Sequence, residues 1–270
     1  MTPSWTEPCA IIDSYMLAHQ LWEVTGNSDY LNDSQMILYN GLYRGQRPNG
    51  GFGCDSTGEY GFLEVRKETY EAKWCCTMRG AEGLTYLSKT AVYIDEKRIT
   101  IPIFSDLSVH FPDLEILEKS SYPKNGYVKI RIEKGDGKVK DLCLFAPERC
   151  DGFQVKVDGK ITRFSRENGF VVFNVVLNSG TESEYTFEQK LHLEQAKNNI
   201  YDNTHQFMIV YGTRVLGSEH DGEKIDIKKM VRLGDEEWQE GDRVFKPISN
   251  GYLMEKVDLI NTRYRVMYQV

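Results

Sequence analysis

Two adjacent cysteines, Cys75 and Cys76, precede a segment with the apolar spacing of a helix. Neighbouring cysteines rarely join in a disulfide, because that bond requires Cβ atoms about 3.8 Å apart and a restricted dihedral angle. Thiolates are good zinc ligands, and zinc usually binds four ligands tetrahedrally. The pair therefore has two interpretations: two small buried side chains, or two sulfurs that bind a common metal ion.

A second pair of ligand types lies in Glu7-Pro8-Cys9, at the start of another expected helix. If the fold brings the two helix starts together, one carboxylate and three thiolates become available to a metal ion. Cys54, in a glycine-rich segment, is a competing sulfur and otherwise an ordinary loop thiol. This spacing is less specific than a pair of Cys-x-x-Cys motifs, so the residues alone leave the metal interpretation open.

Three helices must position these residues. The first is expected from Pro8 to Gly26, because proline is tolerated in a first helical turn and glycine often follows a last one. The second follows Asn27 and Ser28, which are good N-cap residues, and the third follows Cys76. The first helix is apolar around most of its circumference, so it needs neighbours on nearly all sides. We therefore expect part of a larger helical assembly, completed by other segments, another chain or a second copy.

Glycine marks two further places near the cysteines. Residues 45–62 are glycine-rich and are expected to form a long loop, either a plain surface turn or a loop that carries a functional site. Gly80 and Gly83 weaken the third helix unless close packing requires them. His19, within the first helix, is expected to be a buried core histidine, and Trp74 is a candidate for stacking against a sugar.

Beyond the third helix the pattern changes to strands. Several short apolar segments alternate with period two between turn residues, which is typical of a β-sandwich. Asp158-Gly159 predicts a hairpin turn. Residues 184–193 and 207–217 predict two long strands, and the charged residues 220–229 predict an exposed hairpin. The predicted fold is α+β and multidomain, with a helical part at 1–92, a β-sandwich at 93–190 and a second β-rich region at 191–270 that completes the sandwich.

Length and composition limit the function class. The chain has 270 residues, enough for about two domains, and 40% hydrophobic with 27% charged residues is typical of a globular protein. The net charge of −7 disfavours a nucleic-acid partner, because phosphate binding needs a basic surface. No apolar run reaches the ~18 residues of a membrane span, and the N-terminus lacks signal-peptide features. The six cysteines are not spaced as a disulfide framework, so reduced thiols are expected. The sequence leaves the location open, and the lack of signal-peptide features favours the cytoplasm.

A family resemblance is carried by three helical segments: TEPCAIIDSYMLAHQLWEVTG, LYNGLYRGQRPNGGFGCD and WCCTMRGAEGL. They resemble the catalytic barrel of glycoside hydrolase family 127, which includes β-L-arabinofuranosidases. Four strand segments are similar to the sandwich domains that follow that barrel: YPKNGYVKIRIE, LCLFAPERC, FQVKVDGK and FMIVYGTRVLG. The resemblance implies that residues 1–92 are the C-terminal part of an (α/α)6 barrel.

The resemblance also implies a zinc site and a nucleophile. Family members bind zinc through the Glu-x-Cys element and both cysteines of the pair, which correspond here to Glu7, Cys9, Cys75 and Cys76. The first cysteine of the pair, Cys75, is the implied nucleophile of a retaining glycosidase that acts on a carbohydrate.

One catalytic group of the family has no counterpart in this segment. The general acid/base glutamate lies upstream of the Glu-x-Cys element in the family, whereas six residues precede Glu7 and none is acidic. We therefore expect the chain to be the C-terminal portion of such an enzyme and to be inactive by itself. Pro8 and Thr77 stand where better-studied members often have Thr and Pro, which indicates a different branch and leaves the sugar open.

Two other function classes remain open. One is a non-catalytic, zinc-stabilised β-sandwich module that binds a glycan or assembles with a partner. The other is a redox dithiol, in which Cys75 and Cys76 respond to oxidation. Bound zinc without turnover distinguishes the first class, and a thiol count that mild oxidant does not change excludes the second.

Overall fold

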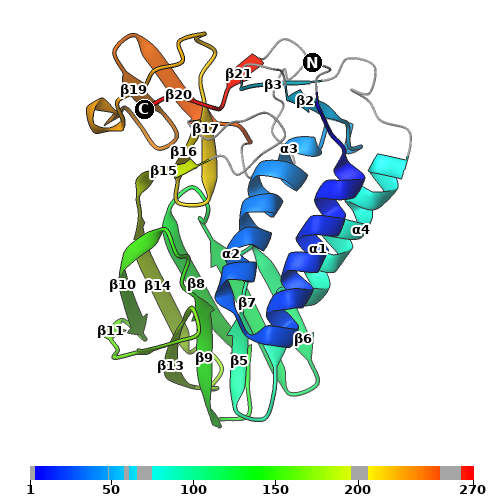
Figure 1. Ribbon diagram of the computed structural model, residues 1–270. Coiled ribbons are helices and arrows are strands. Elements are labelled where there is room, and N and C mark those ends of the chain that lie inside the picture. Colours follow the sequence, from blue (N-terminus) through cyan, green and yellow to red (C-terminus); the bar gives the residue numbers. More distant parts are fainter. Residues whose placement is uncertain (1–3, 48, 58–60, 66–74, 196–205, 250–262) are drawn as a thin grey trace. The chain divides into compact units, whose positions relative to one another are not determined.

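The computed structural model describes residues 4–47, 49–57, 61–65, 75–195, 206–249 and 263–270 (Figure 1). The chain divides into two compact units. The first unit comprises residues 1–19, 33–84 and 190–270, and the second comprises residues 20–32 and 85–189. The domain boundaries that we placed from the sequence, near residues 92 and 190, stay predictions.

The described residues include four α-helices, with the bounds α1 (Pro8–Thr25), α2 (Ser28–Ile37), α3 (Tyr43–Gly45) and α4 (Cys75–Thr90). A π-helical turn, Leu38–Leu42, connects α2 to α3. As predicted, α1 ends before Gly26, whose φ of +67° is the left-handed conformation that glycine adopts most readily. Asn27 caps α2, because its side-chain oxygen accepts a hydrogen bond from the backbone N–H of Asp29 at 3.0 Å.

The glycines of α4 allow close packing within the first unit. A Cβ atom added to Gly80 would lie 2.1 Å from the ring of Phe52. One added to Gly83 would lie 3.3 Å from Ile12 and Leu42. Any side chain at Gly80 would therefore displace the Phe52 ring. Close packing therefore explains why glycine, which weakens a helix, stands at these two positions.

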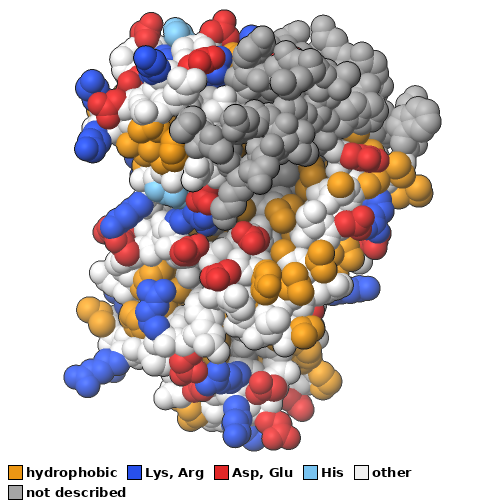
Figure 2. Space-filling view, in the orientation of Figure 1, with side chains coloured by type: hydrophobic (Ala, Val, Ile, Leu, Met, Phe, Trp, Pro, Cys, Tyr) orange, Lys and Arg blue, Asp and Glu red, His pale blue; other side chains and the backbone are white. Residues whose placement is uncertain are grey.

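The helices also expose apolar side chains. Leu17 of α1 is 57% exposed and Met78 of α4 is 71% exposed. Figure 2 shows exposed hydrophobic side chains over the face on which α1 and α4 lie in Figure 1, interspersed with charged ones. The described residues thus do not bury α1 on all sides, and its covering by further helices or another chain stays a prediction.

A four-stranded antiparallel sheet in the first unit has the strand order β1-β2-β3-β21. Its strands are β1 (Ser4–Thr6), β2 (Asp55–Thr57), β3 (Phe62–Val65) and β21 (Arg263–Arg265). The prediction that residues 45–62 form only a loop was wrong, because β2 pairs with β1 on one side and β3 on the other. A partner strand from a distant part of the chain leaves no signal in local composition.

A second sheet of the same unit has six strands in the order β15-β16-β17-β20-β19-β18. Its strands are β15 (Leu191–Gln195), β16 (Phe207–Tyr211), β17 (Arg214–Gly217), β18 (Val231–Arg232), β19 (Trp238–Glu240) and β20 (Arg243–Pro247). Residues 207–217 are a hairpin with a turn at Gly212, φ +58°, rather than the single strand predicted. Residues 220–229 contain a 3₁₀ turn, Ile227–Lys229, instead of the predicted hairpin.

The second unit contains a β-sandwich of a six-stranded sheet, β11-β10-β14-β8-β7-β6, and a five-stranded sheet, β12-β13-β9-β5-β4 (Figure 1). The strands of the first are β6 (Leu107–Phe111), β7 (Leu114–Ser120), β8 (Gly126–Lys134), β10 (Cys150–Val157), β11 (Lys160–Ile161) and β14 (Glu182–Gln189). Those of the second are β4 (Tyr93–Ile94), β5 (Arg98–Ile101), β9 (Val139–Phe145), β12 (Ser165–Glu167) and β13 (Phe170–Val176). A buried hydrogen bond links the two sheets: the hydroxyl of Tyr185 in β14 donates to the carbonyl of Phe145 in β9 at 3.1 Å.

Local turn chemistry was more predictable than strand ends. Asp158 and Gly159 have φ values of +48° and +75° and connect β10 to β11, which confirms the hairpin turn. Residues 184–193, in contrast, are two strands in different sheets, since β14 ends at Gln189 and β15 begins at Leu191. The single long strand predicted there was wrong, because an alternating pattern does not show where the chain leaves one sheet for another.

The described elements are mostly strands with few helices. Membership of α1, α2 and α4 in an (α/α) barrel stays a prediction. No described helix combines the length and the apolar character needed to cross a bilayer.

Candidate metal centre

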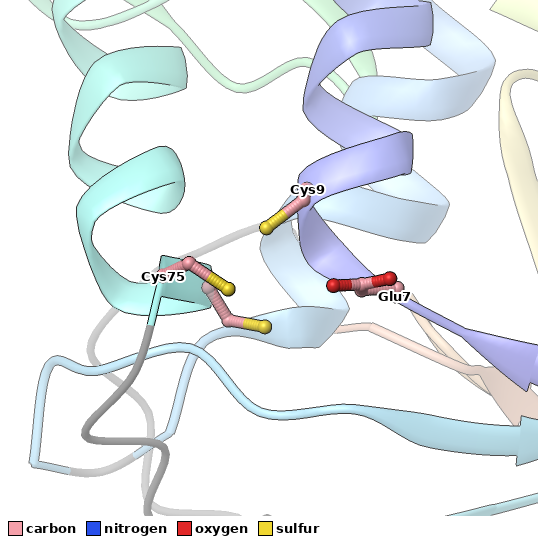
Figure 3. A group of neighbouring side chains, drawn as sticks. Glu7, Cys9 and Cys75 are labelled. Atoms are coloured by element: carbon pink, nitrogen blue, oxygen red, sulfur yellow. The ribbon is translucent and has the colours of Figure 1, made fainter.

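The starts of α1 and α4 bring four potential ligands together (Figure 3). Glu7 directly precedes α1 and Cys9 lies in its first turn. Cys75 and Cys76 are the first two residues of α4. One ligand atom from each side chain, a carboxylate oxygen or a sulfur, lies within 4.8 Å of the other three. Such a cluster can hold a metal ion.

Neighbouring structure fixes both helix starts. Strand β1 pairs with β2 and leads directly into Glu7. At the start of α4, the hydroxyl of Thr77 accepts a hydrogen bond from the backbone N–H of Phe52 at 3.1 Å. Asp13 of α1 forms an ion pair with Arg79 of α4. The two helix starts are therefore held by contacts outside the cluster.

The four side chains differ in exposure and in proton affinity. Cys76 is 5% exposed and Cys9 is partly buried, whereas Glu7 and Cys75 are exposed. Burial, and then the neighbouring sulfur of Cys54, raises the pKa of the Cys76 thiol far above its ordinary value. Burial and the adjacent Cys75 also raise the pKa of Cys9. Both thiols thus need a nearby cation to become thiolates at neutral pH.

In the glycine-rich segment, buried Cys54 contacts the cluster without joining it, and buried Arg47 contacts Cys54. The Sγ of Cys54, a side chain that is 3% exposed, lies 3.9 Å from the Sγ of Cys76. Arg47, 1% exposed, donates through Nη2 to the carbonyl of Cys54 at 3.2 Å. Its Nη1 donates to the carbonyls of Arg44 at 3.1 Å and Gly45 at 3.2 Å. Arg47 was not predicted as a site residue from the sequence, where an arginine within the glycine-rich segment was the available signal.

The remaining sequence candidates lie elsewhere. His19 is fully buried in α1, as predicted. Cys143 and Cys150 are buried in strands β9 and β10 of the sandwich. Trp74, the candidate for stacking on a sugar, lies outside the described residues. Among the residues described, the cluster therefore consists of the four side chains in the Glu-x-Cys and Cys-Cys elements.

Two family models match the sequence. The model of the β-L-arabinofuranosidase GH127 catalytic domain matches residues 1–89, and that of the GH127 middle domain matches residues 98–189. A search of curated proteins found none that matches.

Three solved structures share the fold. A protein described as a glycoside hydrolase aligns with 97% of this chain, with a TM-score of 0.73 and 17% identity. A GH127 β-L-arabinofuranosidase from Geobacillus stearothermophilus T6 aligns with 98%, TM-score 0.68 and 14% identity. A GH127 β-arabinofuranosidase aligns with 99%, TM-score 0.70 and 15% identity. The chain spans 52%, 50% and 50% of their lengths, about half of each. The two matching models together span about two thirds of the sequence, in the order found here, and this chain belongs to glycoside hydrolase family 127.

Proposed function

We propose that this chain supplies the metal centre and the nucleophile of a zinc-dependent retaining glycosidase that cleaves β-L-arabinofuranosides. The observation that carries the proposal is the convergence of Glu7, Cys9, Cys75 and Cys76 at two helix starts. The family favours a carbohydrate substrate, and two of the similar structures are described as arabinofuranosidases. Helices α1, α2 and α4 are assigned in this proposal to the (α/α) barrel of the catalytic domain.

The donor set fits zinc. Zn–S bonds of about 2.3 Å in a tetrahedron place sulfur atoms about 3.8 Å apart. The donors here lie within 4.8 Å of one another, which is close to that spacing. Three thiolates with one carboxylate also suit a borderline ion such as zinc, whereas magnesium and calcium prefer oxygen ligands. Glu7, Cys9, Cys75 and Cys76 would hold the ion, whose charge favours the thiolate forms when it is bound.

In this proposal Cys75 is the nucleophile. It is the exposed member of the pair and stands at the first position of α4, where free N–H groups attract negative charge. In the proposed step its sulfur attacks the anomeric carbon, a C–S bond forms as the glycosidic C–O bond breaks, and the leaving oxygen takes up a proton. Water then cleaves the C–S bond, and the two inversions together retain the configuration.

The other three ligands have holding roles. Cys76 and Cys9, the less exposed thiols, would hold the ion from α4 and α1, and the exposed Glu7 would supply the fourth ligand. The proton for the leaving oxygen is assigned to the upstream glutamate that the family resemblance implies. An aryl arabinofuranoside with an acidic phenol needs little protonation on departure, so it tests the nucleophile without that glutamate.

The test combines metal analysis with covalent trapping. Elemental analysis of the intact chain is expected to find one zinc per chain, and Cys9→Ser is expected to lose most of it. Incubation with the aryl arabinofuranoside is expected to add one pentosyl mass to the peptide that contains Cys75, and Cys75→Ser is expected to show no adduct. A wild-type chain without zinc, or an adduct unchanged in Cys75→Ser, would contradict the proposal.

A further inference from the structure

The thiol of Cys54 lies against the proposed metal centre without being one of its four ligands. Its Sγ is 3.9 Å from the Sγ of Cys76, and the two side chains are 3% and 5% exposed. The Cys54 sulfur is not in the group of donor atoms that lie within 4.8 Å of one another. Cys54 therefore contacts one of the proposed ligands from outside the group of four.

The direction of this sulfur–sulfur hydrogen bond follows from the chemistry of a metal-bound cysteine. A cysteine ligand is a thiolate, which accepts hydrogen bonds and has no proton to donate. With Cys76 bound to a metal, the S–H of Cys54 must be the donor. Hydrogen bonds to metal ligands from outside the coordination sphere orient the ligand, and their loss typically costs about 10–100-fold in metal affinity.

The backbone around Cys54 is anchored on both sides. Buried Arg47 donates to the Cys54 carbonyl at 3.2 Å, which links two residues seven positions apart in the chain. The backbone N–H of Phe52 donates to the hydroxyl of Thr77, the residue after Cys76. Phe52 and Cys54 are thus held against two neighbouring residues of the first turn of α4, Thr77 and Cys76. A plain surface turn has no need of a buried arginine to hold it.

We propose that Cys54 is a positioning residue of the metal centre: its S–H donates a hydrogen bond to the Cys76 sulfur, and Arg47 holds Cys54 in place to do so. The proposal rests on the proposed function, because metal binding by Cys76 sets the direction of the bond. It gives Arg47 and Cys54 a role that the Glu-x-Cys and Cys-Cys elements do not explain.

Zinc affinity tests the donor. Competition with a chromogenic chelator measures the zinc dissociation constant of the intact chain. Cys54→Ala removes the donor and is expected to bind zinc about 10–100-fold more weakly. Cys54→Ser keeps a donating O–H and is expected to stay close to wild type. Cys143→Ala, which removes a buried thiol in the sandwich, is the matched control and is expected to keep wild-type affinity.

Cobalt substitution separates positioning from direct ligation. The intensity of the sulfur-to-cobalt charge-transfer absorption follows the number of thiolate ligands. We expect that intensity to be the same in wild type and Cys54→Ala, with the band shifted in energy because the hydrogen bond to Cys76 is gone. A loss of one thiolate's share of the intensity in Cys54→Ala would show that Cys54 is itself a ligand and would overturn the proposal.

The role of Arg47 is tested by a double-mutant cycle. Arg47→Lys is expected to weaken zinc binding in the wild-type background and far less in the Cys54→Ala background, because both changes remove the same hydrogen bond. Additive losses would overturn the part assigned to Arg47. If Cys54→Ala fails to fold, as judged by circular dichroism of the metal-free protein, Cys54→Val replaces it as a non-donor of similar size.

The outcomes distinguish this proposal from the function on which it rests. Wild type and the non-donor variant binding zinc equally would overturn the role of Cys54 and leave the proposed function intact. A wild-type chain that binds no zinc would overturn both.

Discussion

The cysteines of this protein lie in two regions that place the thiol in different surroundings. In the β-sandwich, Cys143 is buried in β9 of the five-stranded sheet and Cys150 is buried in β10 of the six-stranded sheet. Burial raises the pKa of Cys143 and raises that of Cys150 to about 12. These two thiols are unreactive small hydrophobic side chains.

In the first unit the thiols face one another. The sulfurs of Cys9, Cys75 and Cys76 lie within 4.8 Å of one another, and Cys54 contacts one of them. Packing alone does not require thiols at these positions, because apolar side chains of similar size would fill the same space. The comparison teaches that burial alone leaves a cysteine as a small core side chain, whereas convergence at two helix starts groups its sulfur with other donor atoms that could hold a metal ion.

The largest effect that can break this comparison is metal removal. A ligand present at a thousand times its dissociation constant stabilises the folded state by about 4 kcal/mol. We expect chelation to lower the melting temperature of wild type by several degrees, and to have no effect on Cys76→Ser, which has lost a ligand. Differential scanning fluorimetry with and without chelator measures the difference. Cys150→Ser is the control in the sandwich, and chelator should lower its melting temperature as much as that of wild type. If chelator had no effect on this control, the cysteines of the two regions would not differ in metal binding.

The next effect concerns the packing that holds the start of α4. Gly80→Ala is expected to lower the free energy of unfolding by about 2 kcal/mol, because the new methyl group overlaps the Phe52 ring. Gly234→Ala is the matched control, since a Cβ there meets no atom within 4 Å, and it should stay within about 0.5 kcal/mol of wild type. Urea unfolding measures both. Equal stability of the two variants would show that this helix start is not tightly packed.

The sandwich has its own buried titratable group, Glu118 of β7. Burial, the largest cause, raises the pKa of this carboxyl well above its ordinary value, and its one bonded oxygen accepts from the N–H of Ser105 at 3.0 Å. A raised folded-state pKa means that the folded protein holds the proton more tightly than the unfolded chain does. The stability from this proton is fully present below the ordinary carboxyl value of about 4.3 and is lost as pH rises toward the raised pKa.

We therefore expect the unfolding free energy of wild type to fall with rising pH above that value, by about 1.4 kcal/mol for each unit in which only the folded state stays protonated. Glu118→Gln keeps an acceptor for Ser105 and should remove this slope. Urea unfolding between pH 4.5 and 8 measures it, with the exposed carboxyl variant Glu148→Gln as control. Parallel curves for wild type and Glu118→Gln would mean that the sandwich buries no proton at this position.

The smallest effect is expected from the ion pair between α1 and α4. Asp13→Asn removes the charge that pairs with Arg79, but the Asp13 side chain is 66% exposed and Arg79 also pairs with Glu82. The expected loss of stability is below 1 kcal/mol, with zinc affinity unchanged. The same urea and chelator measurements apply. A loss above 2 kcal/mol would show that this pair, and not backbone packing, brings the two helix starts together.

Local patterns predicted what depends on a few neighbouring residues. The start of α1 at Pro8, its end before Gly26 and the turn at Asp158-Gly159 follow from backbone preferences that each residue carries with it. The predicted strand over 207–217 failed because the same apolar pattern fits one strand or a hairpin. The pairing of β2 with β1 also escaped prediction, because the partner lies in a distant part of the chain.

By itself the sequence determined the types of side chain available as ligands and the helix starts that carry them. Through its resemblance to a family, it also singled out four residues as candidate ligands. Only the tertiary structure decided that Glu7 and Cys9 meet Cys75 and Cys76, and that Cys54 stays just outside their group. The physical reason is that residue preferences act over a few bonds, whereas a metal centre depends on atoms that packing brings within a few ångströms across many residues.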